Sequence, residues 1–112
     1  TILALLILAT IPTLANEPAI SLSVTPSVGF APLKIQATIR ITPNYQNRGI
    51  CIDLVGPIEH RACWQLEGQY DRRTHYYQLR DLPPGEYSAI ATLIKVRGTE
   101  VSTIQSVRAL EQ

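Results

Sequence analysis

The sequence contains few of the residues that usually carry catalysis or metal binding. Its 112 residues include no methionine, two cysteines, two histidines, one tryptophan and one phenylalanine. It also lacks a glycine-rich phosphate-binding loop and a G-x-S-x-G motif around a nucleophilic serine. We therefore expect neither an enzyme nor a cofactor.

Charge of either sign is scarce as well. Ten basic and nine acidic side chains give a formal net charge of +1 at pH 7. A chain this close to neutral gives no electrostatic reason to expect a nucleic-acid partner or an anionic membrane surface. Hydrophobic residues make up 46% of the chain and charged residues 17%, which indicates one globular domain rather than a disordered segment.

The first fifteen residues, TILALLILATIPTLA, carry no charge and run apolar from Ile2 to Ile11, which is too short for a membrane-spanning helix. The run is typical of the hydrophobic part of a signal peptide whose basic start is missing. We expect cleavage after Ala15 and a mature domain of residues 16–112. Such a domain is exported to the periplasm or the cell exterior and has no membrane span after cleavage. An uncleaved anchor or a buried first strand is the alternative.

From Pro18 onward the sequence alternates between apolar and polar residues and is interrupted by Pro, Gly, Asn and Asp, which is typical of short antiparallel strands. The clearest strand is 33–42, where apolar and polar residues alternate without a break. We expect seven strands, at about 20–24, 33–42, 50–55, 61–67, 74–79, 87–96 and 99–109. The last is ambiguous, because its apolar residues recur at every third position from Val101 to Leu110. That spacing predicts either a bulge that switches faces or a short terminal helix.

Both cysteines lie in the stretch Cys51-Ile-Asp-Leu-Val-Gly-Pro-Ile-Glu-His-Arg-Ala-Cys63, which has the pattern of two strands joined by a Gly-Pro turn. If the large apolar residues of both arms face the core, alternation turns both cysteines outward. A hairpin centred on Pro57 pairs Cys51 with Cys63 and Asp53 with Arg61, so charge and bulk agree on one register. Because thiols oxidise in an exported protein, we predict a structural disulfide.

The competing hypothesis is a metal or redox site built from Cys51, His60, Cys63 and His75. Zinc and redox sites usually draw on closely spaced pairs such as C-x-x-C, and the sequence has none. The hairpin register also places His60 opposite Leu54, on the face away from the cysteines. We therefore expect no metal.

The segment Leu82-Pro-Pro-Gly-Glu-Tyr87 resembles the L-x-P-G-x-Y junction of fibronectin type III and related bacterial immunoglobulin-like domains. The resemblance implies that Tyr87 is a structural corner residue, with its ring in the core and its hydroxyl on a backbone acceptor. The stretch from Val24 to Leu33 is similar to the opening of polycystic-kidney-disease-type (PKD) domains. Together with the seven expected strands and the apolar start of the chain, these resemblances imply an all-β fold: a seven-stranded antiparallel immunoglobulin-like β-sandwich preceded by a signal peptide.

Two surfaces are candidates for binding. The first is YDRRTHYY, residues 70–77, and its candidate side chains are Tyr70, Arg72, Arg73, His75 and Tyr76. Aromatic rings beside polar donors are common at sugar-binding and peptide-binding sites. The alternative is structural: one of Tyr76 and Tyr77 belongs to the core, the other lies on a strand exterior, and the arginines solvate a loop.

The second surface is an outward apolar row of Ile90, Ile94 and Val96, which follows if Tyr87 and its alternate neighbours face the core. Exposed apolar rows often mark docking surfaces, unless the C-terminal segment covers this one. We expect an exported, non-catalytic binding, adhesion or accessory module with a protein or glycan partner at the cell surface or in the periplasm. The alternative is a carbohydrate-binding or enzyme-associated accessory domain that uses the Tyr70–Tyr77 surface.

Overall fold

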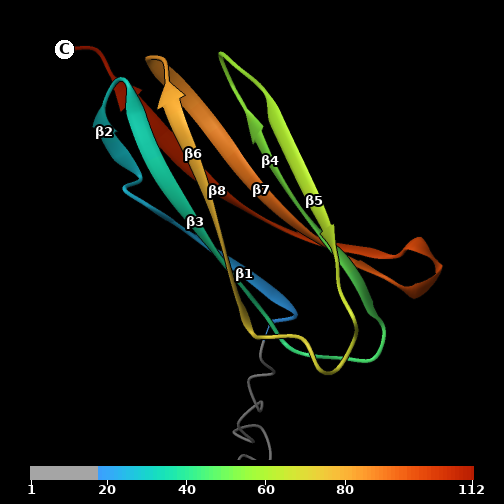
Figure 1. Ribbon diagram of the computed structural model, residues 1–112. Coiled ribbons are helices and arrows are strands. Elements are labelled where there is room, and N and C mark those ends of the chain that lie inside the picture. The colour runs from blue at the N-terminus through green and yellow to red at the C-terminus, as the bar shows by residue number, and fades with distance from the viewer. Residues whose placement is uncertain (1–17) are drawn as a thin grey trace, which may run out of the picture.

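A computed structural model describes residues 18–112 of the protein, so the predicted signal segment and its cleavage site lie outside the described residues. The described chain is built almost wholly of strands (Figure 1). They are β1 Ile20–Thr25, β2 Val28–Phe30, β3 Leu33–Ile41, β4 Asn47–Val55, β5 His60–Gln65, β6 Thr74–Leu82, β7 Gly85–Lys95 and β8 Glu100–Leu110, with a short 3-10 turn, η1 Val96–Gly98. Within this range no helix has the length and apolar character needed to cross a bilayer.

The strands form two sheets that pack into a β-sandwich (Figure 1). One sheet has three strands in the order β1-β3-β6, and the other has five in the order β2-β8-β7-β4-β5. All neighbours are antiparallel except β2 and β8, which run parallel. The prediction of seven antiparallel strands was therefore wrong in two respects: eight strands are present, and the larger sheet is mixed. The extra strand is β2, which lies between the expected strands at 20–24 and 33–42. Its three residues are too few to show an alternating pattern.

The core lies between the sheets and is made by the alternating apolar residues of β3, β4 and β7. In β3 every second residue from Leu33 to Ile41 is buried, which confirms the predicted strand and its core-facing side. The opposing sheet contributes Ile50, Ile52 and Leu54 from β4 and Ala89, Ala91 and Leu93 from β7, all at most 1% exposed. Because side chains alternate along a strand, the residues between these core positions face away from the core.

The last strand resolves the ambiguous three-residue spacing. β8 is one continuous strand whose register with β7 has no shift from Gly85↔Ala109 to Ile94↔Glu100. Both expected alternatives, a face-switching bulge and a terminal helix, are therefore wrong. The spacing was misleading because β8 places two polar residues, Thr103 and Gln105, on the inward side. Ile104 consequently points outward and is 65% exposed.

Gln105 explains one of these inward polar positions. Its side-chain Oε1 accepts a hydrogen bond from the Val24 backbone N–H at 3.0 Å, and its Nε2 donates to the Val24 carbonyl oxygen at 3.4 Å. β1 is an edge strand of the smaller sheet and has a neighbouring strand on one side only. On its open side, the Gln105 amide supplies the hydrogen bonds that a second neighbouring strand would otherwise make. This side chain fastens the two sheets together along one open side of the sandwich.

The corner between β6 and β7 has the predicted form. Tyr87 is 3% exposed, and its hydroxyl donates a hydrogen bond to the Pro83 carbonyl oxygen. The turn between β4 and β5 packs onto this corner: a Cβ at Gly56 would lie 2.6 Å from the Tyr87 ring and 2.7 Å from the Glu86 carbonyl oxygen. The close approach of the two turns requires glycine at position 56.

Candidate functional site

The cysteine hairpin has the predicted register. Cys51 pairs with Cys63 and Asp53 with Arg61 across β4 and β5. The two cysteines form a disulfide, and Arg61 forms an ion pair with Asp53 at 3.0 Å. Among residues 18–112 no cluster of three or more His, Cys, Asp or Glu side chains could hold a metal ion. The stretch is therefore a covalently closed hairpin, and chemistry has to be sought on other surfaces.

His60 lies on the opposite face of that hairpin and joins an aromatic cluster. We call His60, Trp64, His75 and Tyr77 the aromatic edge, because β5 and β6, which carry them, are edge strands of the two different sheets. Tyr77 stacks on His60 and on Trp64 with ring centroids 5.7 and 6.2 Å apart, and Trp64 lies 5.9 Å from the His75 ring. The His60 Nε2 and the Tyr77 hydroxyl are hydrogen-bonded at 2.7 Å. The aromatic edge thus closes the open side of the sandwich opposite Gln105.

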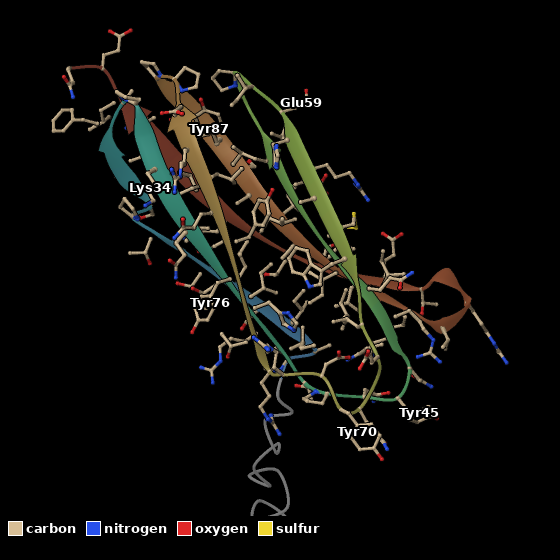
Figure 2. The ribbon with its side chains drawn as sticks, viewed as in Figure 1. Lys34, Tyr45, Glu59, Tyr70, Tyr76 and Tyr87 are labelled. Carbon is tan, nitrogen blue, oxygen red and sulfur yellow. A yellow bond between two sulfur atoms is a disulfide. The ribbon has the colours of Figure 1, made fainter. Side chains whose placement is uncertain are left out.

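Tyr76, the neighbour of Tyr77 on β6, points out of the sandwich and is 65% exposed. It belongs to the outer face of the three-stranded sheet, which we call the polar face. The other outward strand residues of this face are Ser21, Ser23, Thr25, Lys34, Gln36, Thr38, Arg40, Thr74, Gln78 and Arg80. In Figure 2, Tyr76 and Lys34 project on the same side of the molecule. The polar face is therefore a hydrogen-bonding surface with a single aromatic ring near its middle.

The five predicted surface residues do not form one patch. Tyr70 is 85% exposed in the β5–β6 connection and, with Tyr45, lines a hollow of about 400 Å³ at the loop end of the molecule (Figure 2). His75 turns to the aromatic edge, where its Nε2 donates to the Arg72 carbonyl oxygen at 3.0 Å. Tyr76 and Tyr77 face opposite sides of β6, as the structural alternative predicted. Alternation along the strand separates side chains that are adjacent in sequence.

Two shallow hollows flank the beginning of β6. One, of about 340 Å³, is lined by Trp64, Arg72, Thr74, His75, Tyr76 and Tyr77. The other, of about 240 Å³, is lined by Pro18, Ser21, Arg40, Ile41, Thr42 and Arg73. Tyr76 borders the first, and two arginines border the second. The structure thus places Tyr76 and Arg72 beside one hollow, and Arg73 and Arg40 beside the other.

Arg40 was missed from the sequence. Its position on the outward side of 33–42 was predictable from the alternation, but its closeness to Tyr76 depends on the pairing of β3 with β6. In that register Thr38 lies opposite Tyr76 and Arg40 lies opposite Thr74. The sequence does not show that β3 pairs with β6, so it could not predict that Arg40 and Tyr76 lie close together.

The outer face of the five-stranded sheet carries a modified version of the predicted apolar row. Ile90 and Ile94 lie on it and are half-buried, whereas Val96 lies past the end of β7 in η1. Ile104 takes its place, because β8 lies beside β7 and pairs it with Ile90. We call Ile90, Ile94 and Ile104 the apolar row. The C-terminal segment flanks this row instead of covering it.

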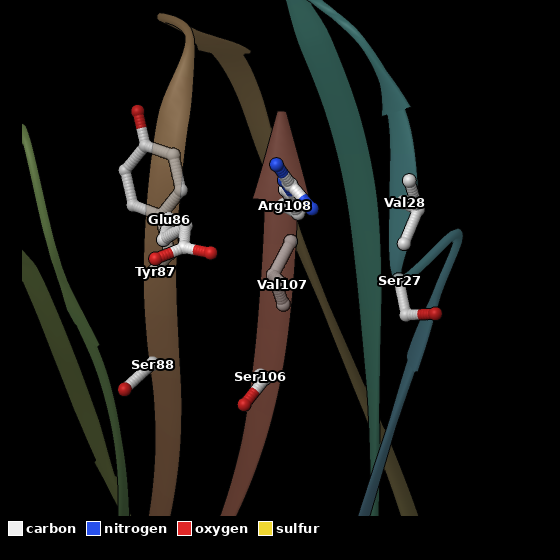
Figure 3. A pocket seen from close by; sticks show the side chains of 8 residues that line it. All are labelled: Ser27, Val28, Glu86, Tyr87, Ser88, Ser106, Val107 and Arg108. Carbon is white, nitrogen blue, oxygen red and sulfur yellow. The ribbon is translucent and has the colours of Figure 1, made fainter. Parts of the chain in front are cut away.

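A further hollow of about 400 Å³ lies on the same outer face, near the corner (Figure 3). Figure 3 shows Glu86 of β7 and Arg108 of β8 on neighbouring strands, with Ser88 and Ser106 further along them. These pairs are directly opposite each other in the β7–β8 register. No histidine is among the residues that line this hollow.

Comparison with known proteins supports the fold alone. No protein-family model and no curated protein matches the chain. Among solved structures, the chain is similar to part of a family 76 glycoside hydrolase from a bovine Bacteroides thetaiotaomicron strain, with a TM-score of 0.56 and 18% sequence identity. The match covers 81% of this chain and 20% of that one, so the chain spans about a fifth of the neighbour's length.

Proposed function

We propose that this chain is an exported, non-catalytic module of immunoglobulin-like fold that binds a carbohydrate on its polar face, as an accessory to other proteins. The observation that carries the proposal is the exposed ring of Tyr76 on the outer face of a sheet, beside amide and hydroxyl side chains. An aromatic ring on such a surface gives a sugar ring a face to pack on, while neighbouring polar groups bind its hydroxyls.

The neighbours of Tyr76 have the chemistry that this requires. Thr38 lies directly opposite Tyr76, and Gln36 lies diagonally across from it and hydrogen-bonds Gln78 at 3.4 Å. Thr38 and Gln36 are only half-buried, so their polar atoms face solvent beside the ring. Hydroxyl and amide groups both donate and accept hydrogen bonds, as sugar hydroxyls do. A shallow, polar surface of this kind suits a polymer that lies across it better than a small molecule that must be enclosed.

The setting of the proposal has separate support. The Cys51–Cys63 disulfide suits an oxidising compartment. The strand order and the Tyr87 corner support the immunoglobulin-like assignment. A similar fold inside a glycoside hydrolase chain agrees with an accessory role beside carbohydrate chemistry, although a likeness at 18% identity indicates fold and no ligand.

The test is a glycan array probed with the purified mature chain, compared with its Tyr76→Ala and Tyr70→Ala variants. Tyr70 is a matched control because it is an exposed tyrosine at the loop end, away from the polar face. We expect binding to be abolished by Tyr76→Ala and retained by Tyr70→Ala. Binding that survives Tyr76→Ala, or no binding to any glycan, would contradict the proposal.

The apolar row supports a second candidate, docking of a protein partner. Ile104 is 65% exposed and lies directly opposite Ile90, so apolar area is continuous across β7 and β8. A pull-down from the periplasmic or surface fraction, compared with Ile104→Lys and with Ser106→Lys on the same strand face, tests it. Loss of a partner with Ile104→Lys alone supports this candidate; equal capture by both variants contradicts it.

A further inference from the structure

We propose that the glycan bound on the polar face is anionic, with Arg40 binding its carboxylate or sulfate group while the sugar ring packs on Tyr76. This inference rests on the proposed carbohydrate function and specifies its ligand. It follows from the distribution of charge over the two sheets, from the register that places Arg40 near Tyr76, and from the hollow beside Arg40.

Charge is unequally distributed over the sandwich although the whole chain is nearly neutral. The strands of the polar face carry three outward basic residues, Lys34, Arg40 and Arg80. The acidic residue on these strands is Asp81, at the bulge opposite Lys34 and at the far end from Arg40. Among residues 18–112, one ion pair has its nitrogen and oxygen atoms within 4 Å, and it joins Arg61 to Asp53 on the other sheet. Within the described range, 18–112, none of the three cations of the polar face has a carboxylate oxygen within 4 Å.

The β3–β6 register sets the spacing between the ring and the charge. Tyr76 lies opposite Thr38, so Arg40 is its diagonal neighbour on the same face. Diagonal neighbours across an antiparallel pair are about 7–8 Å apart, which long side chains span easily. A sugar ring seated on Tyr76 would therefore hold a charged substituent within reach of the Arg40 guanidinium.

The hollow beside Arg40 has the right lining for such a substituent. Its volume is about 240 Å³, and Arg40, Arg73, Ser21 and Thr42 contribute polar side chains to it. A guanidinium binds carboxylate and sulfate oxygens through two parallel N–H donors, and these charge-assisted bonds are stronger than neutral ones. A neutral sugar would offer the Arg40 guanidinium no anionic group to bind.

A glycan fits this face better than other polyanions. Between the cations at its two ends, Lys34 and Arg40, the polar face presents uncharged amide and hydroxyl groups and one tyrosine ring. Those two cations are six residues apart on β3, which is about 20 Å along a strand. Lipid headgroups and polyphosphates need dense positive charge, whereas this spacing suits a chain that alternates charged groups with hydroxyls.

The experiment measures affinity by calorimetry for two matched pairs of glycans. Oligogalacturonate is compared with its methyl ester, and dextran sulfate with dextran, since the members of each pair share one sugar backbone and differ in whether it carries charged groups. We expect at least one charged member to bind about tenfold or more tightly than its neutral partner, and the affinity to fall as sodium chloride is raised. The pair that responds identifies the source of charge as carboxylate or sulfate.

Variants and other polyanions complete the test. Arg40→Gln and Tyr76→Ala should each weaken binding of the charged glycan by about tenfold or more, since both side chains are exposed and neither contributes to the core. Arg97→Gln is the charge-matched control, because Arg97 lies in η1 at the tip of the β7–β8 hairpin, and it should leave binding unchanged. Inorganic polyphosphate and phosphatidylglycerol vesicles should bind weakly and without dependence on Tyr76.

The outcomes separate this inference from the proposed function. Equal binding of charged and neutral partners, lost with Tyr76→Ala, overturns the inference and leaves the carbohydrate function in place. Equal loss with Arg97→Gln, or polyphosphate or vesicles binding as tightly as the charged glycan, overturns it as non-specific charge attraction. Failure of both charged glycans to bind overturns it as well, and failure of every glycan on the array overturns the proposed function too.

Discussion

The Tyr87 hydroxyl donates a hydrogen bond of 2.6 Å to the carbonyl oxygen of Pro83, four residues earlier in the chain. This bond joins the end of β6 to the start of β7, with the tyrosine ring in the core below it. The β4–β5 turn lies against the same ring. One side chain therefore holds three segments of the sandwich together at its corner.

Replacing Tyr87 with phenylalanine should lower the free energy of unfolding by about 1 kcal/mol, because the ring stays and the hydrogen bond to Pro83 is lost. Urea unfolding of the wild type and Tyr87→Phe at neutral pH measures this. Tyr45→Phe, at an exposed loop tyrosine, is the control and should unfold as the wild type does. Equal stability of all three proteins would show that the corner bond contributes nothing.

The same pair of proteins should differ in alkaline solution. Burial raises the pKa of Tyr87 above its ordinary value of 10.0. The folded protein thus retains the phenolic proton at a pH where the unfolded chain loses it. The stability from this group is complete below about pH 10 and is lost as the pH rises through the folded-state pKa. Tyr87→Phe should lose less stability between about pH 9 and pH 11 than the wild type.

The disulfide should supply stability and no reactivity. Its cysteines are 12 residues apart in sequence, and closing a loop of this size contributes on the order of 3 kcal/mol in the chain-entropy model. Cys51→Ala with Cys63→Ala, and reduction of the wild type, should each lower the urea midpoint. Asp53→Asn, which removes the neighbouring exposed ion pair, should cost less than about 1 kcal/mol. Two titratable thiols in denatured, unreduced protein would contradict the bond itself.

The hairpin register was predictable because three independent patterns coincide there. Alternation puts Cys51 and Cys63 on one side, opposite charges put Asp53 beside Arg61, and the Gly56-Pro57 turn fixes the centre. Local pairing of this kind depends on a few neighbouring residues, so the sequence holds all the information. The Tyr87 corner was predictable for the same reason, since its acceptor is four residues away.

Long-range pairing was not predictable in this way. β2 pairs with β8, so Val28 finds its partner at Arg108, near the other end of the chain. A three-residue strand has too little pattern to reveal such a pairing. The candidate site has the same origin, because Arg40 and Tyr76 belong to strands whose adjacency is a property of the fold. The alternation of β8 could not be recognised from the sequence, because polar residues such as Gln105 occupy inward positions. The inward position of Gln105 is explained by its hydrogen bond to β1, which the sequence does not reveal.

Gln105 provides a test of the connection between the sheets. Gln105→Leu keeps the volume but leaves the Val24 N–H and carbonyl without their side-chain partners. An unsatisfied, partly buried backbone group costs about 1–3 kcal/mol, so the variant should unfold at lower urea and exchange the Val24 amide faster. Ser106→Ala, the outward neighbour, should change neither. Unchanged exchange at Val24 in Gln105→Leu would show that β1 is held by packing alone.

Asp71 connects the stability of the β5–β6 loop to the proposed binding face. Its carboxylate accepts hydrogen bonds from the backbone N–H groups of Glu67 and Gly68, at 2.8 Å each, just before Arg72 and Arg73. Asp71→Ala removes both acceptors, so we expect a more mobile loop and weaker binding of an anionic glycan, even though the substitution makes the protein more positive.

Simple charge attraction predicts the reverse for Asp71→Ala, because removal of an acid near two arginines should strengthen binding of an anion. Glu111→Ala makes the same change in net charge at the exposed C-terminal end and serves as the control. Calorimetry with the charged glycan then distinguishes the two accounts. Weaker binding in Asp71→Ala alone means that the loop positions the arginines, whereas equal or tighter binding in both variants means that charge acts without geometry.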